Sequence, residues 1–448
     1  MDKQCRKRTY VRMLIYDLAL TVFFILSSVV LVARVLLKGG QLRFSNFFAK
    51  FGFYSRKVLD RIDQTPDGER IWIHAVSLGE VKIALDMMKE MKRQDPSKSF
   101  IISVSTQTAW KSASETMLTS AGPSDVLTFY PLDLAFSVRR AIRHLKPSAI
   151  IVVETEIWPN FICAASEYGI PFFLVNARLS DSSVRGYTFF SSLFRGVFSR
   201  ISHVYAQSAM DADRFKRAGV PENCISVSSS FKFGIPKRNP DKENELRAWA
   251  GGGPILLGGS IWPGEDVLLL KAYVRLKPVI PELKLLLVPR HSSTVPAIER
   301  HVRKFGLSSC RRSHGQQPVP GTGVYICDTS GELSSLYELA SAVFVGKTVS
   351  EHGGQNMIEP CAIGKPVVVG PYTENFRQVM KDLLSEDAIV QIPEDDAAEM
   401  EEAVIKVIGR FLTEPDFASA YSNRAVAAVE KRVGSMEACA RDIIARIA

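Results

Sequence analysis

The sequence lacks the cysteine spacing of a structural metal site. Its seven cysteines are scattered through 448 residues without a Cys-x-x-Cys pair. An odd, unpatterned set argues against structural zinc and favours a reducing compartment, with most cysteines packed as small apolar residues. The Asp-x-Asp motif Asp211-Ala-Asp213 lies at a predicted helix start without further oxygen ligands beside it, so we interpret it as a helix cap. No metal and no cofactor are predicted.

Excess basic charge is missing from most of the chain. Residues 1 to 61 contain twelve Lys or Arg and three Asp, so they account for the entire net charge of +9. A nucleic-acid enzyme would spread basic charge over its binding face, so no nucleic-acid partner is expected. Charge confined to one end instead suggests contact with the anionic lipids of a membrane surface.

The N-terminal apolar run falls short of the roughly 20 residues that a full membrane span needs. Leu18 to Ala33 is uncharged for 16 residues. We predict a monotopic or short N-terminal anchor, with a spanning helix as the related alternative. A cleaved signal peptide is less favoured, because Ala33-Arg34 is a poor cleavage context. Aromatic residues are expected to continue the membrane contact: Phe44, Phe47, Phe48, Phe51, Phe53 and Tyr54.

The chain is too long for one core and predicts two α/β domains. Between residues 71 and 227, β-branched apolar runs alternate with helical patterns, which indicates parallel sheets built from βαβ units. A second series of this kind runs from residue 255 to 369, and the last ~50 residues have a helical pattern. The predicted parts are residues 1–66, a membrane-associated segment; 67–235, the first α/β domain; 236–250, a linker; and 251–448, the second α/β domain with a helical tail.

The first candidate site residue is Glu80. The apolar run from Ile71 to Val76 predicts a buried strand, and Ser77 and Gly79 form a small turn before a predicted helix. In doubly wound sheets, ligands bind at the carboxyl ends of such strands, where Glu80 is expected. The alternative is that Glu80 only complements the helix dipole.

Further polar residues follow other predicted strands of the first domain. Glu154 and Glu156 come after the apolar run Ile150 to Val153, where two carboxylates can accept hydrogen bonds from hydroxyl groups. The alternative is a helix-start signal with Pro159 in the first turn. Arg178 supplies a cation at the same edge, and Lys232 lies between two phenylalanines at the domain junction.

The second domain repeats this arrangement. Ser260 and the turn Pro263-Gly264-Glu265 follow its first strand and predict anion binding by backbone N–H groups. Pro289-Arg290-His291 follows its second strand and offers a fixed positive charge for phosphate. Glycines before Asn356 would let the backbone approach a ligand, and Asn356 and Glu359 would share one helix face. A carboxylate at that place can bind a ribose diol, whereas the alternative is a glycine turn before a capped helix.

These motifs together resemble one enzyme family. HAVSLGE, ETEIWPN, NARLS, the Lys-Phe pair at the junction, GS with PGE, VPRH, GEL and GGxNxxEP occur in the order and spacing of the 3-deoxy-D-manno-octulosonic acid (Kdo) transferases of lipopolysaccharide biosynthesis. The resemblance implies an α/β GT-B fold, with two doubly wound domains facing a cleft. It also implies an inverting, metal-independent transfer of Kdo from CMP-Kdo to the lipid A precursor, at the cytoplasmic face of the inner membrane and in contact with its anionic lipids.

The resemblance assigns roles to the residues already named. Glu80 would be the general base, with Glu154 and Lys232 supporting the transition state. The acceptor, in the first domain, would contact Ser77, Gly79, Glu156 and Arg178. The donor, in the second domain, would contact Ser260, Pro289, Arg290, His291, Gly331, Glu332, Leu333, Asn356, Met357, Ile358 and Glu359. The alternatives are a GT-B transferase that uses a UDP-sugar, and an inactive membrane-tethered binding protein, which would be expected to lack the base.

Overall fold

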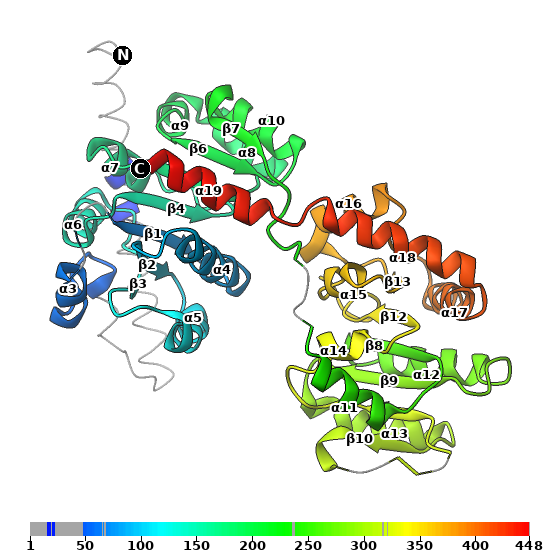
Figure 1. Ribbon diagram of the computed structural model, residues 1–448. Coiled ribbons are helices and arrows are strands. Elements are labelled where there is room, and N and C mark those ends of the chain that lie inside the picture. Colours follow the sequence, from blue (N-terminus) through cyan, green and yellow to red (C-terminus); the bar gives the residue numbers. More distant parts are fainter. Residues whose placement is uncertain are drawn as a thin grey trace. The chain divides into compact units, whose positions relative to one another are not determined.

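The chain forms two compact α/β units, as the computed structural model shows (Figure 1). The structure describes residues 16–18, 20–22, 48–64, 66, 69–234, 238–315, 318–319 and 321–447. The first unit comprises Met1–Phe231 and Gly434–Ala448, and the second comprises Lys232–Val433.

These bounds differ from the predicted domains at three places. Residues 48–64, predicted as part of a membrane segment, pack into the first unit. The predicted linker contains helix α11 (Pro240–Ala250), which belongs to the second unit. The predicted helical tail is divided, because its last helix, α19 (Ser435–Ile447), returns to the first unit.

The first unit is built on a sheet of seven parallel strands in the order β3-β2-β1-β4-β5-β6-β7. Its strands are β1 (Arg70–Ala75), β2 (Ser99–Val104), β3 (Val126–Phe129), β4 (Ala149–Val153), β5 (Phe172–Ala177), β6 (His203–Ala206) and β7 (Ile225–Val227). Every residue of β1, β2, β4 and β5 is buried, as expected for strands covered on both faces. The predicted strands of this domain are therefore confirmed.

Helices cover both faces of this sheet. They are α3 (Arg56–Asp63), α4 (Leu78–Gln94), α5 (Gln107–Ser120), α6 (Ala135–Leu145), α7 (Pro159–Glu167), α8 (Asp181–Phe189), α9 (Ser191–Phe198) and α10 (Ala209–Ala218). On one face α19 lies beside α4 (Figure 1). Hydrogen bonds that join α19 to the rest of this unit include those from Tyr205 to Asp442 over 2.5 Å and from Arg93 to Glu437 over 3.0 Å. Apolar side chains of α19 thus pack in the core beside a sheet whose strands lie far earlier in the sequence.

The second unit also has seven parallel strands, in the order β10-β11-β9-β8-β12-β13-β14. They are β8 (Ile255–Ile261), β9 (Lys284–Pro289), β10 (Ser309–Arg311), β11 (Val324–Ile326), β12 (Ala342–Val345), β13 (Val367–Val369) and β14 (Val390–Gln391). Besides α11, the helices are α12 (Glu265–Leu276), α13 (Val295–Lys304), α14 (Leu333–Tyr337), α15 (Ile358–Ala362), α16 (Arg377–Ser385), α17 (Ala397–Thr413) and α18 (Pro415–Glu430). The five strands predicted here are confirmed, and β10 and β14 were not predicted.

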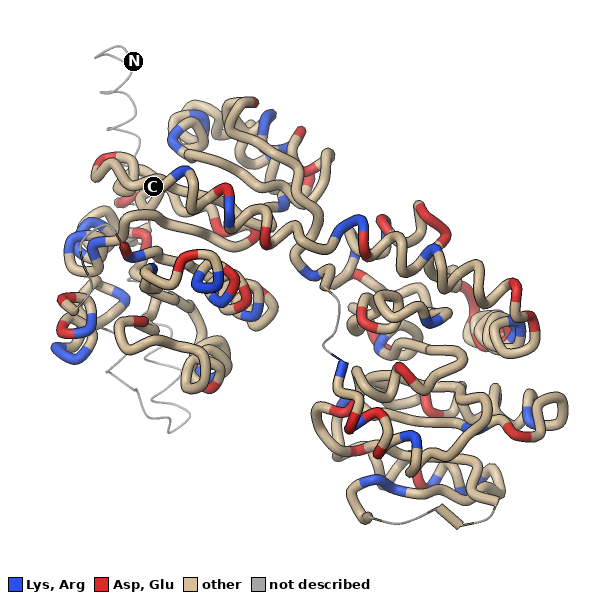
Figure 2. Tube along the Cα trace, viewed as in Figure 1, with Lys and Arg blue, Asp and Glu red and all other residues tan. Residues whose placement is uncertain are grey.

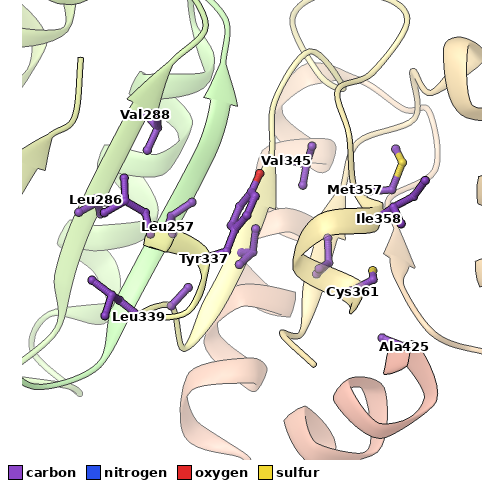
Figure 3. Close-up of a cluster of buried hydrophobic side chains, with 14 of the residues drawn as sticks. Leu257, Leu286, Val288, Tyr337, Leu339, Val345, Met357, Ile358, Cys361 and Ala425 are labelled. Atoms are coloured by element: carbon purple, nitrogen blue, oxygen red, sulfur yellow. The ribbon is translucent and has the colours of Figure 1, made fainter. Parts of the chain in front are cut away.

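One core of the second unit is packed around Tyr337, which is fully buried (Figure 3). Leu257 and Leu286 from β8 and β9 lie on one side of it, and Met357 and Cys361 lie toward α15 (Figure 3). A Cβ atom at Gly259 would come within 2.4 Å of the Tyr337 hydroxyl, so glycine is required where β8 passes this ring.

Three aromatic residues of the predicted membrane-associated segment have contacts within the first unit. The ring of Phe51 stacks on Phe136 at 6.2 Å, Phe53 lies 3.7 Å from the guanidinium of Arg140, and Tyr54 packs against the core of the first unit. These three side chains therefore contact protein. Within the described part of the chain, no helix is both long enough and apolar enough to cross a membrane. Most of the predicted anchor, Leu18 to Ala33, lies outside the described residues.

Lys and Arg residues are interspersed with Asp and Glu residues along the trace of each unit (Figure 2).

Candidate functional site

The candidate site of the first unit lies where its sheet changes direction. The chain proceeds from β1 to one edge of the sheet and then returns to place β4 on the other side of β1. Such a switch point is where open α/β sheets bind ligands. Glu80 follows β1 and Glu154 follows β4, and His74 on β1 pairs in register with Val152 on β4. The two carboxylates are therefore brought to the same edge.

The surroundings of Glu80 hold its carboxylate in place and also raise its pKa. Ser77 is the N-cap of α4, and the Glu80 carboxylate accepts hydrogen bonds from the Ser77 hydroxyl and from the Val76 N–H, each at 2.8 Å. The helix-capping role of Glu80, given above as the alternative, is therefore observed. However, Glu80 is only 7% exposed, and burial raises its pKa against the lowering effect of these hydrogen bonds. The charge of Glu154 raises it further. A carboxylate with a raised pKa is a better proton acceptor than an ordinary one.

Glu154 and Glu156 complete a group of three interacting carboxylates. Glu154 is buried and has a φ of 62°, a left-handed conformation that is strained for any residue except glycine. Glu156 accepts a hydrogen bond from Trp158 Nε1 at 2.9 Å. Burial raises the pKa of Glu156, and the charges of Glu80 and Glu154 add to this effect. Three carboxylates at one edge can orient several hydroxyl groups of a sugar.

Arg178 neutralises Glu154. Its Nη2 and Nε atoms lie 2.7 and 2.9 Å from Glu154 Oε2. The cation predicted for the acceptor is therefore at this edge, although the observed partner is Glu154. Gly79 is exposed in the first turn of α4.

Asn176 is a site residue that the sequence analysis did not select. It lies near the end of β5 and has a φ of 50°. Its Nδ2 atom donates to Glu154 Oε1 at 3.4 Å, and its Oδ1 atom accepts the Phe231 N–H at 3.0 Å. Asn176 thus connects the Glu154 turn to the residue that precedes Lys232. The available signal was an asparagine at the carboxyl end of a buried strand, two residues before Arg178.

Lys232 belongs to the second unit, whereas Glu80 and Glu154 belong to the first. Its ammonium group donates to the carbonyl oxygen of Asn375 at 3.1 Å and lies 5.1 Å from the Phe376 ring centroid. The loop before α16 therefore positions this cation.

The second unit has its switch point between β8 and β12. Ser260, near the end of β8, has a φ of 51°. The Arg290 backbone N–H donates to the Ile261 carbonyl oxygen at 3.0 Å, which fixes the Arg290 turn while its side chain is exposed. His291 contacts the ring of Trp262 at 5.4 Å between centroids. An exposed guanidinium at this edge suits a phosphate group.

Carboxylates of the chain itself accept several backbone N–H groups beside the start of α12, where anion binding was predicted. Glu265 is 1% exposed, and its carboxylate accepts the N–H groups of Trp262, Lys347, Thr348 and Val349. Asp266 accepts the N–H of Gly264 at 3.2 Å. The chain's own carboxylates occupy these donors, so no phosphate is needed to satisfy them.

Glu359 is held by two neighbours. It accepts hydrogen bonds from Asn356 Nδ2 at 2.9 Å and from the Ser334 hydroxyl at 2.8 Å, while Met357 and Ile358 are buried. Asn356 and Glu359 are therefore together, as their spacing predicted, and Ser334 on α14 was not foreseen. The side chain is half-buried and can accept further hydrogen bonds.

Glu332 has a different environment from the other residues that were predicted to bind the sugar donor. It is 5% exposed and forms ion pairs with Lys242 at 2.7 Å and Arg312 at 3.2 Å, with Thr329 as a further donor. Burial alone would raise its pKa, but these donors hold the pKa at about 2. The carboxylate is thus a permanently charged connection between α11, the Arg312 segment and the turn that carries Gly331 and Leu333.

The Asp-x-Asp motif has the structural role predicted for it. Ser208 is the N-cap of α10, and Asp211 accepts the Ser208 hydroxyl at 2.6 Å and the Leu179 N–H at 3.1 Å. One oxygen of Asp211 therefore stabilises the start of α10, and the other holds the backbone that precedes α8.

Known proteins are similar to this chain in sequence and in fold. The family model described as 3-Deoxy-D-manno-octulosonic-acid transferase (kdotransferase) matches residues 45–235. The 3-deoxy-D-manno-octulosonic acid transferase of Haemophilus influenzae is 32% identical over 77% of this chain and 79% of its own length. The enzyme of that name from Bordetella pertussis is 32% identical over 72% of this chain and 76% of its own length.

The fold also matches a solved structure. A glycosyltransferase from Rickettsia africae has a TM-score of 0.56 and 14% identity, with 84% of this chain and 98% of that chain covered. This likeness supports the GT-B class of fold. Identity above 30% over more than two thirds of a relative, together with the carboxylate group at the first switch point, shows that the chain belongs to the 3-deoxy-D-manno-octulosonic acid (Kdo) transferase family.

Proposed function

We propose that the protein is a glycosyltransferase of lipopolysaccharide biosynthesis that moves Kdo from CMP-Kdo to a hydroxyl group of the lipid A precursor. The observation that carries this proposal is the group of Glu80, Glu154 and Glu156 at the β1/β4 switch point of a chain that belongs to the Kdo transferase family. Glu80 takes the proton of the acceptor hydroxyl as its oxygen attacks the anomeric carbon, and CMP leaves from the opposite face.

Donor binding is assigned to the second unit. Arg290 is exposed at the end of β9 and binds the CMP phosphate, whose charge it offsets without a metal ion. Glu359, already oriented by Asn356 and Ser334, accepts hydrogen bonds from the ribose hydroxyls. Lys232 and Glu154 support the charge that develops in the transition state.

The proposed place of action is the cytoplasmic surface of the inner membrane. The acceptor is a lipid anchored in the bilayer by acyl chains, so its sugars are reached from the surface. The +9 charge of residues 1 to 61 favours an anionic membrane.

One experiment tests the function directly. The full chain is incubated with a CMP-Kdo generating system and lipid IVA, and the products are analysed by mass spectrometry. We expect one or more Kdo increments on the lipid. Absence of transfer from CMP-Kdo, with transfer from a UDP-sugar instead, would replace this proposal with the UDP-sugar alternative.

A further inference from the structure

The first unit contains an apolar cavity. None of the described residues that line it has a role in the proposed reaction. Its volume is about 340 Å³, within the range of small-molecule sites. It lies along the carboxyl edge of the sheet, because Val76 follows β1, Ser105 follows β2 and Tyr130 follows β3. The full lining is Leu20, Lys50, Val76, Ser105, Tyr130, Pro131, Leu132, Asp133, Leu134 and Trp158.

Two lining residues connect the cavity to the carboxylates. The Val76 N–H donates to Glu80 Oε2 at 2.8 Å, and Trp158 Nε1 donates to Glu156 Oε2 at 2.9 Å. Each residue thus lines the cavity and also donates an N–H group to a carboxylate. A ligand seated here therefore has hydrocarbon in the cavity and hydroxyl groups at Glu80 and Glu156.

A buried hydroxyl group in the lining points to a ligand with a polar atom. Tyr130 is 7% exposed, and its hydroxyl has no hydrogen-bond partner among the residues that the structure describes. Its ring stacks on His74 at 4.0 Å between centroids, which fixes its orientation. A buried hydroxyl left without a partner is costly, so an oxygen atom of a ligand would remove that cost. Lys50 adds a cation to the same lining.

We propose that this cavity receives one acyl chain of the acceptor, with the ester or amide oxygen near the polar end of that chain accepting the Tyr130 hydroxyl. The acceptor class is thus a sugar that carries hydrocarbon, held by its chain as well as by its hydroxyl groups. This inference rests on the proposed function, because it assumes that a sugar hydroxyl reacts at Glu80. It adds that the acyl chain contributes to acceptor binding inside the protein, next to the reacting group.

The test uses the full chain and acceptors that share one sugar headgroup but carry progressively shorter acyl chains. For acceptors whose chains are short enough to be dissolved in water as monomers, the KM should rise about fourfold for each methylene removed from the part of the chain that the cavity buries. Ser105→Trp fills the cavity and should abolish this dependence on chain length. Thr119→Trp, on the exposed end of α5, is the matched control and should retain it.

Tyr130→Phe provides a second measurement that does not depend on filling the cavity. Because the hydroxyl has no described protein partner, its removal should leave the melting temperature unchanged. It should raise the acceptor KM about fivefold, the equivalent of one hydrogen bond, while kcat changes little.

The outcomes separate the inference from the proposed function. If the parent transfers Kdo but KM is independent of chain length, the inference is wrong and the function stands. If the parent transfers Kdo to no acceptor of the series, the proposed function itself fails. A Tyr130→Phe variant with lower stability and unchanged KM would assign the hydroxyl a structural role and contradict the ligand contact.

Discussion

At the residue scale, the capping and catalytic interpretations of Glu80 are compatible. The hydrogen bonds from Ser77 and Val76 fix the carboxylate in place, and burial among other carboxylates raises its pKa. A general base needs both a fixed position and a tuned pKa. The helix cap therefore serves as the support that orients the base.

Glu80→Gln tests this role. Glutamine is nearly isosteric, and its carbonyl oxygen can accept the Val76 N–H while its NH2 group donates to the Ser77 hydroxyl, but it cannot take up a proton. Turnover should fall by a factor on the order of 10² to 10⁴. CMP affinity, measured by calorimetry, should be unchanged, because the proposed donor residues lie in the other unit. Glu90→Gln, nearly three turns along the same helix, is the control; equal activities of the two variants would remove Glu80 from the mechanism.

The pH dependence of the reaction tests the environment of Glu80. Burial and the charge of Glu154 raise the Glu80 pKa above its ordinary 4.5. The base is active only when deprotonated, so kcat/KM should rise with pH through that raised value and fall off below it. Glu154→Gln removes one of the causes and should move this acidic limb to lower pH. A limb that stays in place in the variant would show that Glu154 does not influence the titrating group.

Arg290 and Glu359 are expected to contact different parts of CMP, the phosphate and the ribose respectively. Arg290→Ala removes a charge-assisted phosphate contact worth roughly 1.5–3 kcal/mol, so CMP affinity should fall at least tenfold. Glu359→Gln should weaken CMP but change the affinity for inorganic phosphate little, because its proposed partner is the ribose. Calorimetry with both ligands checks this, and parent-like CMP binding by both variants would mean that the nucleotide is placed wrongly.

At the element scale, the sequence was sufficient where a strand is long, apolar and buried on both faces. Runs such as Ile150 to Val153 are continuous because helices cover both sides of the sheet. The strands β10 and β14 have three and two residues and are partly exposed, so their sequences carry no apolar run. The positions of the site residues at strand ends could be predicted from these strands. The residues that contact them could not be predicted, because contacts such as that of Glu332 with Lys242 depend on how distant helices pack.

Glu332 shows how such partners alter a prediction made from position alone. Because its pKa is lowered to about 2, its ion pairs stabilise the fold above the ordinary pKa of 4.5 and are lost as the pH falls toward 2. Glu332→Gln should lower the free energy of unfolding on the order of 1–3 kcal/mol at neutral pH and remove this acid dependence. Urea unfolding at several pH values measures both. Unchanged stability with weaker CMP binding would instead favour the direct donor contact.

At the scale of the whole molecule, the first unit is assembled from distant parts of the chain. Ile62 on α3 is 1% exposed in its core, the Arg61 guanidinium donates to the Asp125 carbonyl oxygen at 3.3 Å, and the Leu132 N–H donates to the Lys50 carbonyl oxygen at 2.7 Å. Residues 48–64 are therefore part of this unit. Composition did not reveal this, because basic and aromatic residues there are equally typical of a membrane surface.

Two truncated chains distinguish the predicted boundary from the observed one. A chain that begins at Phe48 keeps α3, whereas one that begins at Asp67 loses it together with the burial of Ile62, which alone contributes about 1.5–3 kcal/mol. Thermal unfolding of the shorter chain should therefore show a first unit that melts at lower temperature, while the second unit is unchanged. CMP binding should be the same in both, because the proposed donor residues all follow residue 232. Equal stability of the first unit in the two chains would restore the boundary at residue 67. If both bind CMP but only the longer one transfers Kdo, the segment from residue 48 to 64 is part of the folded acceptor unit and not only a contact for lipid.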